Sequence, residues 1–244
     1  GYYRQSLDAD GDQHMRPESW SPEAVLEPLD LRVALTLEGR RVLLRPWCYR
    51  IDGLGGTVPV YFLDTDLPEN DPADRALCRQ LYASDPGARL RQEAVLGIGG
   101  VRVLRALGLA SLRAYHMNEG HSALLAAELL REIAPEGVLG ADDVERVRER
   151  CVFTTHTPVP AGHDQFPAAL YEPVLGPLYV DLLHQAGCRT DHTLNMTHAA
   201  LRVSRFVNGV AMRHGEVSRD LFPGYSVRSI TNGVHAVTWV AAPM

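Results

Sequence analysis

Hydrophobic and polar positions along the first half of the chain form short blocks that predict particular elements. Two strand-like runs, 41–51 and 57–63, flank a glycine-rich stretch at 53–56, which predicts a β-hairpin. Helical periodicity follows over 74–82 and again over 89–107, where apolar residues recur at spacings of three to five. We therefore expect a hairpin followed by two helices.

The second half of the chain alternates strand-like and helical segments more regularly. We expect strands at 111–117, 151–155 and 227–230. We expect helices at 121–133, 142–150, 170–185 and 195–213. Strands that alternate with helices predict an α/β fold with a Rossmann-like, mainly parallel sheet and helices on both faces.

Glycines and prolines modify this picture in three places. The GLGG sequence at 53–56 is not followed by a helix, and a phosphate-binding loop needs a helix N-terminus, so we interpret it as a turn. Gly97, Gly99 and Gly100 lower helix propensity within 89–107, and we expect them to permit close packing. The first 30 residues are polar and interrupted by three prolines, which predicts a surface excursion near the N-terminus.

Composition limits the partners and the compartment. The 244 residues are 45% hydrophobic and 22% charged, as in ordinary folded domains, and one domain over 1–244 is the simplest organisation. A net charge of -6 argues against nucleic acid as a partner. No window reaches the roughly 18 apolar residues of a membrane helix, and the polar N-terminus is unlike a signal peptide. The four cysteines form no CxxC pair, which predicts buried free thiols in a cytoplasmic protein.

The segment CVFTTHTPVPAGHDQF, at 151–166, contains the strongest candidate site. A short apolar run ends there in hydroxyls, histidines and prolines, and ligands of open α/β sheets bind beyond the carboxyl ends of strands. His156 is therefore predicted to contact a ligand. A second candidate is HMNEGH at 116–121, where a strand passes into a helix. There, Asn118 as a helix cap and His116 as a satisfied core histidine remain open alternatives.

The histidines of these two segments do not have the spacing of a metal site. His116 and His121 are five positions apart rather than four, and the segment is not HExxH. His156 and His163 are seven positions apart with two prolines between them, which is a poor chelating arrangement. We therefore expect no bound metal.

Two polar residues near the C-terminal end are further candidates. Asn208 lies in an apolar row of the helix expected at 195–213, where a buried amide needs a partner, either a backbone group or a ligand hydroxyl. Glu216 is either part of a helix-end ion pair or a carboxylate of the site.

Four long motifs occur in a fixed order: HMNEGHSALLAAELL, FTTHTPVPAGHDQF, NMTHAALRVSRFVNGVAMRHGEVSR and ITNGVHAVTW. Together they resemble the α-glucan phosphorylases, most closely the shorter bacterial branch of the glycogen, starch and maltodextrin phosphorylases. GYYRQSLDADG and RLRQEAVLGIGG also fit, so the resemblance covers nearly the whole chain. It implies that residues 1–244 are most of the N-terminal, glucan-side domain of a two-domain glycosyltransferase-B (GT-B) fold, without the C-terminal domain.

The resemblance also implies a reaction. Members of the family transfer the terminal glucosyl unit of an α-1,4-glucan to phosphate and release glucose 1-phosphate with retained configuration. Their cofactor, pyridoxal phosphate, acts through its phosphate group, and its Schiff-base lysine belongs to the C-terminal domain. We therefore expect the isolated chain to be inactive and to have that domain as its partner, with a homo-oligomer compatible with this picture.

Two residues of this chain resemble residues of the family that contact the reacting glucose. His156 matches the histidine whose backbone carbonyl is available to an oxocarbenium-like transition state, where hydrogen bonds that strengthen as charge develops contribute most. Asn208 matches the asparagine that hydrogen-bonds the same glucose. Glu119, His121 and Thr157 match polar walls of that site.

Asp85 resembles an acidic residue of the family's gating loop. The sequence departs from the family here, because Pro86 follows directly in a shortened segment where an asparagine is usual. The family's glycine-rich substrate loop would precede Gly1, so Gly53 to Gly56 do not correspond to it.

Two alternatives belong to other functional classes. A non-catalytic glucan-binding module would retain His156 and Asn208 without a catalytic partner domain. A nucleotide-sugar glycosyltransferase of the same fold would bind UDP- or ADP-glucose instead of phosphate.

Overall fold

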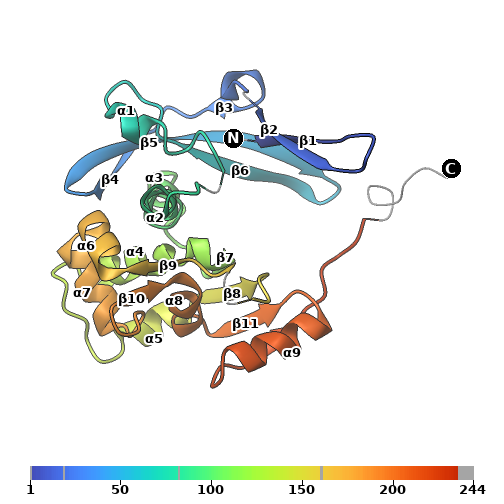
Figure 1. Ribbon diagram of the computed structural model, residues 1–244. Helices are drawn as coiled ribbons and strands as arrows, with labels where there is room; N and C mark the ends of the chain where they lie inside the picture. The colour runs from blue at the N-terminus through green and yellow to red at the C-terminus, as the bar shows by residue number, and fades with distance from the viewer. Residues whose placement is uncertain (1, 19, 82, 160–161, 236–244) are drawn as a thin grey trace.

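The computed structural model describes residues 2–235 apart from 19, 82, 160 and 161. Its strands form an antiparallel layer and a parallel layer, with a long helical segment between them (Figure 1). The helical segment contacts strands of the first layer and helix α4 of the second. The predicted α/β class with a parallel sheet is confirmed, and a separate antiparallel sheet accompanies it.

The antiparallel layer contains the predicted hairpin. β5 (Arg40–Gly53) and β6 (Gly56–Asp64) pair over their whole length, and Gly53 lies opposite Gly56 at the turn. β4 (Val33–Leu37) and β3 (Glu27–Pro28) add to β5 in the order β3-β5-β4. The first residues form a further surface hairpin of β1 (Tyr2–Leu7) and β2 (Gln13–Glu18), which continues into a short 3-10 turn, η1 (Pro22–Ala24).

The parallel sheet has its strands in chain order across the sheet. They are β7 (Tyr115–Asn118), β8 (Cys151–Thr155), β11 (Phe206–Gly209) and β12 (Val227–Ser229). In β7 the odd positions, Tyr115 and Met117, are buried, whereas the even positions, His116 and Asn118, are exposed. Parallel sheets are normally covered on both faces, so an exposed polar face is unusual.

The helices and the remaining short strands lie around these sheets. The helices are α1 (Pro72–Arg75), α2 (Pro86–Ala94), the π-helical η2 (Val95–Gly99), α3 (Gly100–Ala106), the 3-10 η3 (Gly120–Ser122), α4 (Leu124–Ile133), α5 (Asp143–Arg148), α6 (Ala168–Leu175), α7 (Pro177–Gln185), α8 (Met196–Arg202) and α9 (Met212–Leu221). A two-stranded sheet pairs β9 (Gln165–Pro167) with β10 (Thr193–Asn195).

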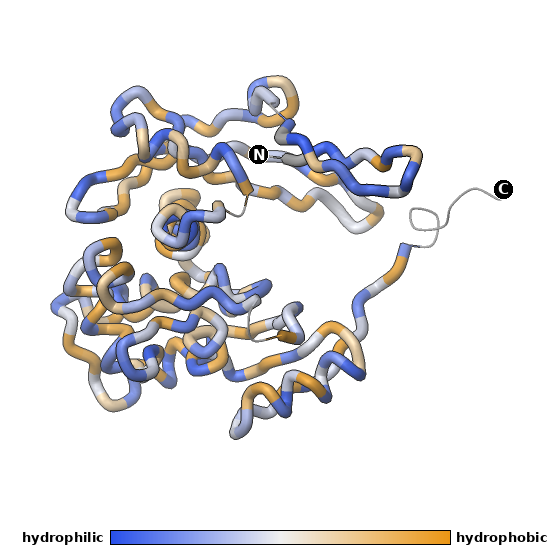
Figure 2. The backbone as a smooth tube through the Cα atoms, viewed as in Figure 1, coloured by the Kyte–Doolittle hydropathy of each residue, from blue (hydrophilic) through white to orange (hydrophobic). Residues whose placement is uncertain are grey.

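The central segment α2–η2–α3 is the predicted helix 89–107, and its glycines explain its position. A Cβ added at Gly97 would lie 2.5 Å from the backbone nitrogen of Leu125, so only glycine lets the two backbones approach this closely. Gly99 is in similar contact with the side chain of Leu44 on β5. The expectation of close packing is confirmed, and both hydrophobic and hydrophilic positions occur along this segment (Figure 2).

One buried charge cluster ties three helices together. Glu128 of α4 is fully buried, and its carboxylate accepts hydrogen bonds from Arg102 of α3 (2.8 Å) and Arg131 (2.9 Å). The hydroxyl of Tyr179, on α7, donates to the same carboxylate. Burial alone would raise the pKa of Glu128, but these donors outweigh it and lower the pKa.

The prediction of one long helix at 195–213 is wrong. Asn195 caps α8 by accepting the amide of His198, and the helix ends at Arg202. The next apolar residues form β11, which pairs with β8 on one side and β12 on the other. A short apolar run fits either a helix or a buried strand, and here pairing with two neighbouring strands decides the outcome.

Other boundaries also differ from the sequence prediction. The helix expected at 74–82 is only the single turn α1, and Tyr82 lies outside the described residues. The helix expected at 170–185 is divided at Gly176, whose φ of 77° a non-glycine residue rarely adopts. The strand expected at 111–117 begins at Tyr115. The end of the ITNGVHAVTW motif, from 236 onward, also lies outside the described residues.

The state of the cysteines and the lengths of the helices agree with the expectations drawn from composition. All four cysteines are free, and three of them are buried while Cys78 is partly buried. Within the described part of the chain, every helix is too short or too polar to cross a lipid bilayer.

Candidate functional site

Polar side chains form a row across one face of the parallel sheet, where Asn118 is exposed and Thr154 and Asn208 are buried. Asn118 on β7 lies opposite Thr154 on β8, and Thr154 lies opposite Asn208 on β11. Side chains at the same register of neighbouring strands point to the same face, so these three residues are aligned near the carboxyl ends of their strands. The structure thus places Asn208 on a strand rather than on a helix.

Hydrogen bonds connect the row. The Thr154 hydroxyl donates to Asn208 Oδ1 over 2.9 Å, and His116 Nε2 lies 2.7 Å from the same hydroxyl oxygen. Because a hydroxyl has one hydrogen, His116 donates from Nε2. Asn208 is 8% exposed and gives one amide hydrogen to the carbonyl of Gly209 at 3.3 Å. The partner that the sequence required for Asn208 is therefore a side chain and a backbone group.

Glu119 joins the end of β7 to the end of β8. Its carboxylate accepts the backbone amides of Gly120 (2.9 Å) and His156 (2.7 Å) and the hydroxyl of Thr157 (3.1 Å). Its backbone has φ 73° and ψ 165°, a region that residues other than glycine rarely enter. The three hydrogen bonds hold this strained conformation, so Glu119 positions the start of the loop after β8.

His156 lies at the opening of this loop and is exposed. Its Nε2 is 2.5 Å from Asn118 Oδ1, and an amide oxygen only accepts, so Nε2 is the protonated nitrogen. Asn118 therefore orients the imidazole rather than capping a helix. Within the described residues, the backbone carbonyl of His156 accepts no hydrogen bond.

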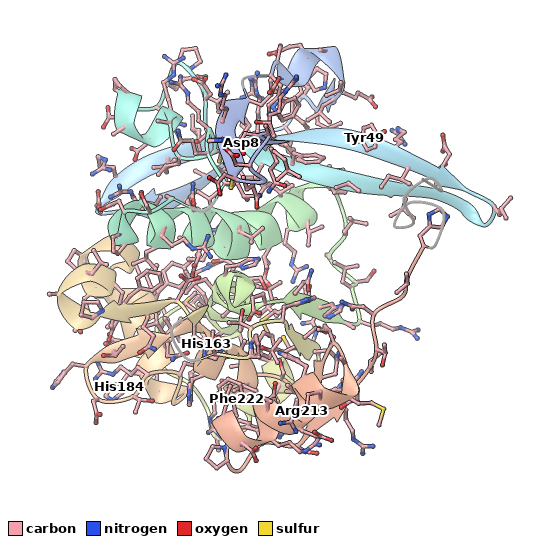
Figure 3. The ribbon with its side chains drawn as sticks, turned by 45° about the vertical axis from the view of Figure 1, so that its right-hand side comes forward. Asp8, Tyr49, His163, His184, Arg213 and Phe222 are labelled. Carbon is pink, nitrogen blue, oxygen red and sulfur yellow. The ribbon has the colours of Figure 1, made fainter. Side chains whose placement is uncertain are left out.

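The far end of the loop is fixed by His163. Its Nε2 lies 3.2 Å from the carbonyl of Thr157, and its ring packs on Phe222 at the end of α9 with centroids 5.3 Å apart (Figure 3). His214 of α9 accepts the amide of Val210 through Nδ1. Burial lowers the pKa of His214, which keeps this ring neutral beside the site.

His121 faces a different part of the molecule. It lies on η3 and lines an apolar pocket of about 330 Å³ together with Arg89 and Glu93 of α2. Burial and the positive charge of Arg89 lower the pKa of His121, so the ring is neutral near pH 7. Of the predicted site residues, only His121 lines this pocket.

Asp85 serves as the N-cap of α2. Its Oδ1 accepts the backbone amide of Ala88 over 2.7 Å. Among the described contacts, none joins Asp85 to His156 or to the polar row. The structure therefore brings together His156, Thr157, Glu119 and Asn208, whereas Asp85 caps α2 and His121 lines a pocket with Arg89 and Glu93 of that helix.

The remaining candidates have structural explanations. Glu216 forms an exposed ion pair with Arg213 one turn away on α9, at 2.8 Å. Among the described residues, no three histidine, cysteine or acidic side chains are close enough to hold a metal ion. His116 and His156 each bond a neutral partner instead.

Sequence reasoning missed several residues that shape the site. Thr154 links His116 to Asn208, and Asp164 ends the loop with a bond from Arg89. The alternation of residues 151–155 could have indicated that Thr154 shares a face with Asn208, had the 206–209 strand been recognised. Arg89 and Glu93 have the i,i+4 spacing of a helical ion pair, which was the available signal.

The fold and the polar strand ends together define a class. A parallel sheet whose carboxyl edge carries amides, imidazoles and hydroxyls, with helices packed on it, defines an α/β ligand-binding class and is consistent with the N-terminal half of a GT-B fold. Neutral donors and acceptors of this kind suit ligands rich in hydroxyl groups.

Comparison with known proteins specifies the family. The chain is 37% identical to a glycogen phosphorylase of Mycobacterium tuberculosis over 99% of its length, and 36% identical to a maltodextrin phosphorylase of Thermococcus litoralis over 98%. A glycogen phosphorylase of Aquifex aeolicus is 28% identical over the whole chain. A scan against family models finds no match. The chain belongs to the α-glucan phosphorylase family.

The chain spans about a third of the length of these relatives, covering 32% of the Mycobacterium tuberculosis protein, 31% of the Thermococcus litoralis protein and 38% of the Aquifex aeolicus protein. Pyridoxal phosphate, the family's cofactor, needs a lysine to form its Schiff base. All 24 residues counted as lysine or arginine in this chain are arginines, so these residues do not fit that role.

Proposed function

We propose that this chain is the glucan-side part of an α-glucan phosphorylase, which transfers a terminal glucosyl unit from an α-1,4-glucan to phosphate. The observation that carries the proposal is the polar row at the carboxyl edge of the parallel sheet, in a chain similar to glycogen and maltodextrin phosphorylases. Hydroxyl, amide and imidazole groups at three neighbouring strand ends provide donors and acceptors for one sugar ring.

In this proposal, His156 and Asn208 contact the glucosyl unit directly. The His156 carbonyl, which accepts no bond from the described residues, faces positive charge that develops on the ring. Asn208 uses one amide hydrogen internally and offers the second to a sugar hydroxyl. Hydrogen bonds that strengthen toward the transition state accelerate the reaction more than uniform binding does.

The other candidates have supporting roles. Glu119 fixes the backbone of His156 and the hydroxyl of Thr157, so it orients both. His121 of η3, kept neutral by burial, contacts sugar hydroxyls. Asp85 caps α2 at the entrance, and a gating role for it remains part of the proposal.

The proposal assigns the cofactor and the phosphate to residues outside this chain. Pyridoxal phosphate supplies proton transfer to the substrate phosphate when it is bound, and a chain without lysine takes no part in holding it as a Schiff base. We propose a C-terminal domain as the partner, a cytoplasmic location, and no activity of residues 1–244 alone.

The test uses the protein as its gene encodes it. We expect phosphate-dependent release of glucose 1-phosphate from maltodextrin, and a loss of about tenfold or more in kcat/KM for Asn208→Ala, since one such hydrogen bond contributes ~1–3 kcal/mol. Glu216→Gln, in an exposed ion pair of α9, is the matched control and keeps wild-type kinetics. Thermal unfolding of both variants separates a lost contact from a lost fold.

Two results would overturn the proposal. Glucan binding without phosphorolysis would make the protein a binding module. Binding and turnover of UDP- or ADP-glucose, with no requirement for phosphate, would make it a nucleotide-sugar glycosyltransferase.

A further inference from the structure

Two carboxyl groups and one guanidinium meet where α2 faces the end of the 156–164 loop. Arg89 Nη2 donates to Asp164 Oδ2 over 2.7 Å, and Arg89 Nε lies 3.0 Å from Glu93 Oε1. Glu93 is 2% exposed, and it lies close enough to Asp164 for each carboxyl group to shift the pKa of the other. A single cation therefore serves two buried or half-buried acids.

The geometry favours a carboxylic acid at Glu93 rather than a carboxylate. Neither oxygen of Glu93 accepts a well-formed hydrogen bond from a donor in the described structure, although Arg89 is near. An ionised carboxylate without such bonds is costly in a buried position. A protonated Glu93 can instead donate to Asp164, because an acid has one hydrogen to give.

The electrostatics agree with this assignment. Burial is the main cause that raises the pKa of Glu93 to about 9, and the neighbouring Asp164 adds to it. For Asp164, burial acts in the opposite direction from the hydrogen bonds of Arg89 and Glu93, and these bonds lower its pKa. The pKa values of the two acids thus shift in opposite directions, so that Glu93 is neutral and Asp164 is charged.

Few other ionisable groups face this pair from the surrounding elements. His121 of η3 lines the same pocket and is neutral near pH 7 because its pKa is lowered. Tyr61 of β6 and Cys78 also line the pocket, and burial raises the pKa of the Cys78 thiol. Helix α6 presents the apolar Leu170 to the first turn of α2.

The pair connects the two elements that border the proposed sugar site. Helix α2 begins at its cap Asp85, whereas Asp164 ends the loop that carries His156 and Thr157. The carbonyl of Asp164 also accepts the amide of Met196 at the start of α8. A change at this pair therefore acts on the position of the loop.

We propose that Glu93 and Asp164 share one proton and that this acid pair, with Arg89, is a positioning device that holds the 156–164 loop against α2. The proposal rests on the proposed function for its consequence: ionisation of Glu93 places two adjacent negative charges against one arginine, loosens the loop and weakens glucan binding. Glu93 and Asp164 are positioning residues, because they act through the loop.

The first experiment needs neither glucan nor a measurement of activity. The carboxyl carbons of glutamate labelled with carbon-13 are followed by NMR across a pH titration of the protein as its gene encodes it. We expect one glutamate to titrate far above the others, and its signal to be missing from Glu93→Gln. If all glutamates titrate in their ordinary range, the shared proton does not exist.

The second experiment compares KM for maltodextrin and kcat between wild type and Glu93→Gln from pH 6 to pH 10. The amide that this substitution introduces donates a hydrogen to Asp164 at every pH. We therefore expect KM to rise at alkaline pH in wild type but not in the variant, while the profile of kcat is little changed. Identical KM profiles would overturn the positioning role.

Stability provides a readout that is independent of activity. The unfolding equilibrium constant of wild type should rise with pH by up to about tenfold per unit relative to Glu93→Gln, because the folded state alone keeps the proton. Asp164→Asn should weaken this dependence, since Arg89 then pairs with Glu93 alone, although burial still raises the pKa of Glu93. If phosphorolysis is absent but the titration is shifted, the acid pair stands and the proposed function fails.

Discussion

Two buried glutamates on different helices have pKa values shifted in opposite directions. Glu128 on α4 is bonded by two arginines and a tyrosine, and its pKa is lowered although it is fully buried. Glu93 on α2 shares one arginine with Asp164, and its pKa is raised to about 9. The difference shows that burial alone does not decide the charge of a carboxyl group, because enough hydrogen-bond donors outweigh it at Glu128 and not at Glu93.

The same substitution in both places tests this comparison most strongly. Glu128→Gln leaves two arginines, each about a quarter to a third exposed, without their anion, and we expect a loss of about 2–4 kcal/mol in the free energy of unfolding. Glu93→Gln replaces a neutral acid by a neutral amide that needs no proton on folding, so it should not lower the free energy of unfolding at pH 7 and should raise it. Urea unfolding measures both, and equal losses would contradict the assignment of charge.

The two variants should also differ from wild type in opposite pH ranges. The lowered pKa of Glu128 contributes stability that is present at neutral pH and lost in acid, so the deficit of Glu128→Gln shrinks below about pH 4. The raised pKa of Glu93 costs the folded state up to about 1.4 kcal/mol per pH unit as the pH rises from about 5 toward about 9, so Glu93→Gln gains relative to wild type there. Unfolding at several pH values checks both slopes.

The contact between the helical segments that carry these glutamates offers a third test. Gly97→Ala would place a Cβ 2.5 Å from the backbone of Leu125, and we expect a loss of about 1–3 kcal/mol despite the better helix propensity of alanine. Gly100→Ala in the same segment meets only Leu63, at 3.9 Å, and should gain about 0.5–1 kcal/mol. Stabilisation by both changes would show that the segments are not in close backbone contact.

Loss of the neutral hydrogen bonds of Thr154 should lower the free energy of unfolding less than loss of the charge on Glu128. Thr154→Val keeps the shape of the side chain but removes the hydroxyl between His116 and Asn208, with an expected cost of about 1–2 kcal/mol. Thr154→Ser retains the hydroxyl and is the matched control. Thermal unfolding measures the cost, and a valine variant as stable as wild type beside a destabilised serine variant would indicate that methyl packing, not the hydrogen bond, is responsible.

An exposed glutamate sets the lower limit of the series. Glu216 pairs with Arg213 on the surface of α9, and Glu216→Gln should change the free energy of unfolding by no more than about 0.5 kcal/mol. Added salt should reduce even this difference. An effect as large as that of Glu128→Gln would break the rule that burial makes donor number important.

Much of the fold could be predicted from local pattern, and the exceptions have a common cause. The 151–155 strand is a continuous run of strand-forming residues that ends in a proline-rich loop, so its type and end were both evident. The 206–209 strand was mistaken for helix because four apolar positions fit either period, and only pairing with β8 and β12 distinguishes them. The break at Gly176 depends on a backbone angle that the residue type permits but does not require.

The candidate site was partly accessible from sequence for a similar reason. His156, Thr157 and Glu119 lie at strand ends that the pattern locates, and the structure brings them together. The charge state of Glu93 could not be inferred, because it depends on Asp164, which is distant in sequence and reaches α2 only through the fold. Whether these groups contact glucose stays a prediction.

The backbone angle and the hydrogen bonds of Glu119 together limit which substitutions position 119 tolerates. Its backbone favours glycine, whereas its carboxylate is needed by three donors, so the two requirements conflict at one position. Glycine would relieve the backbone and lose every bond; any other residue would keep the strain and lose most of them. A saturation library at position 119 should therefore return the wild-type codon almost alone, whereas the exposed His116, with one bond, tolerates several replacements.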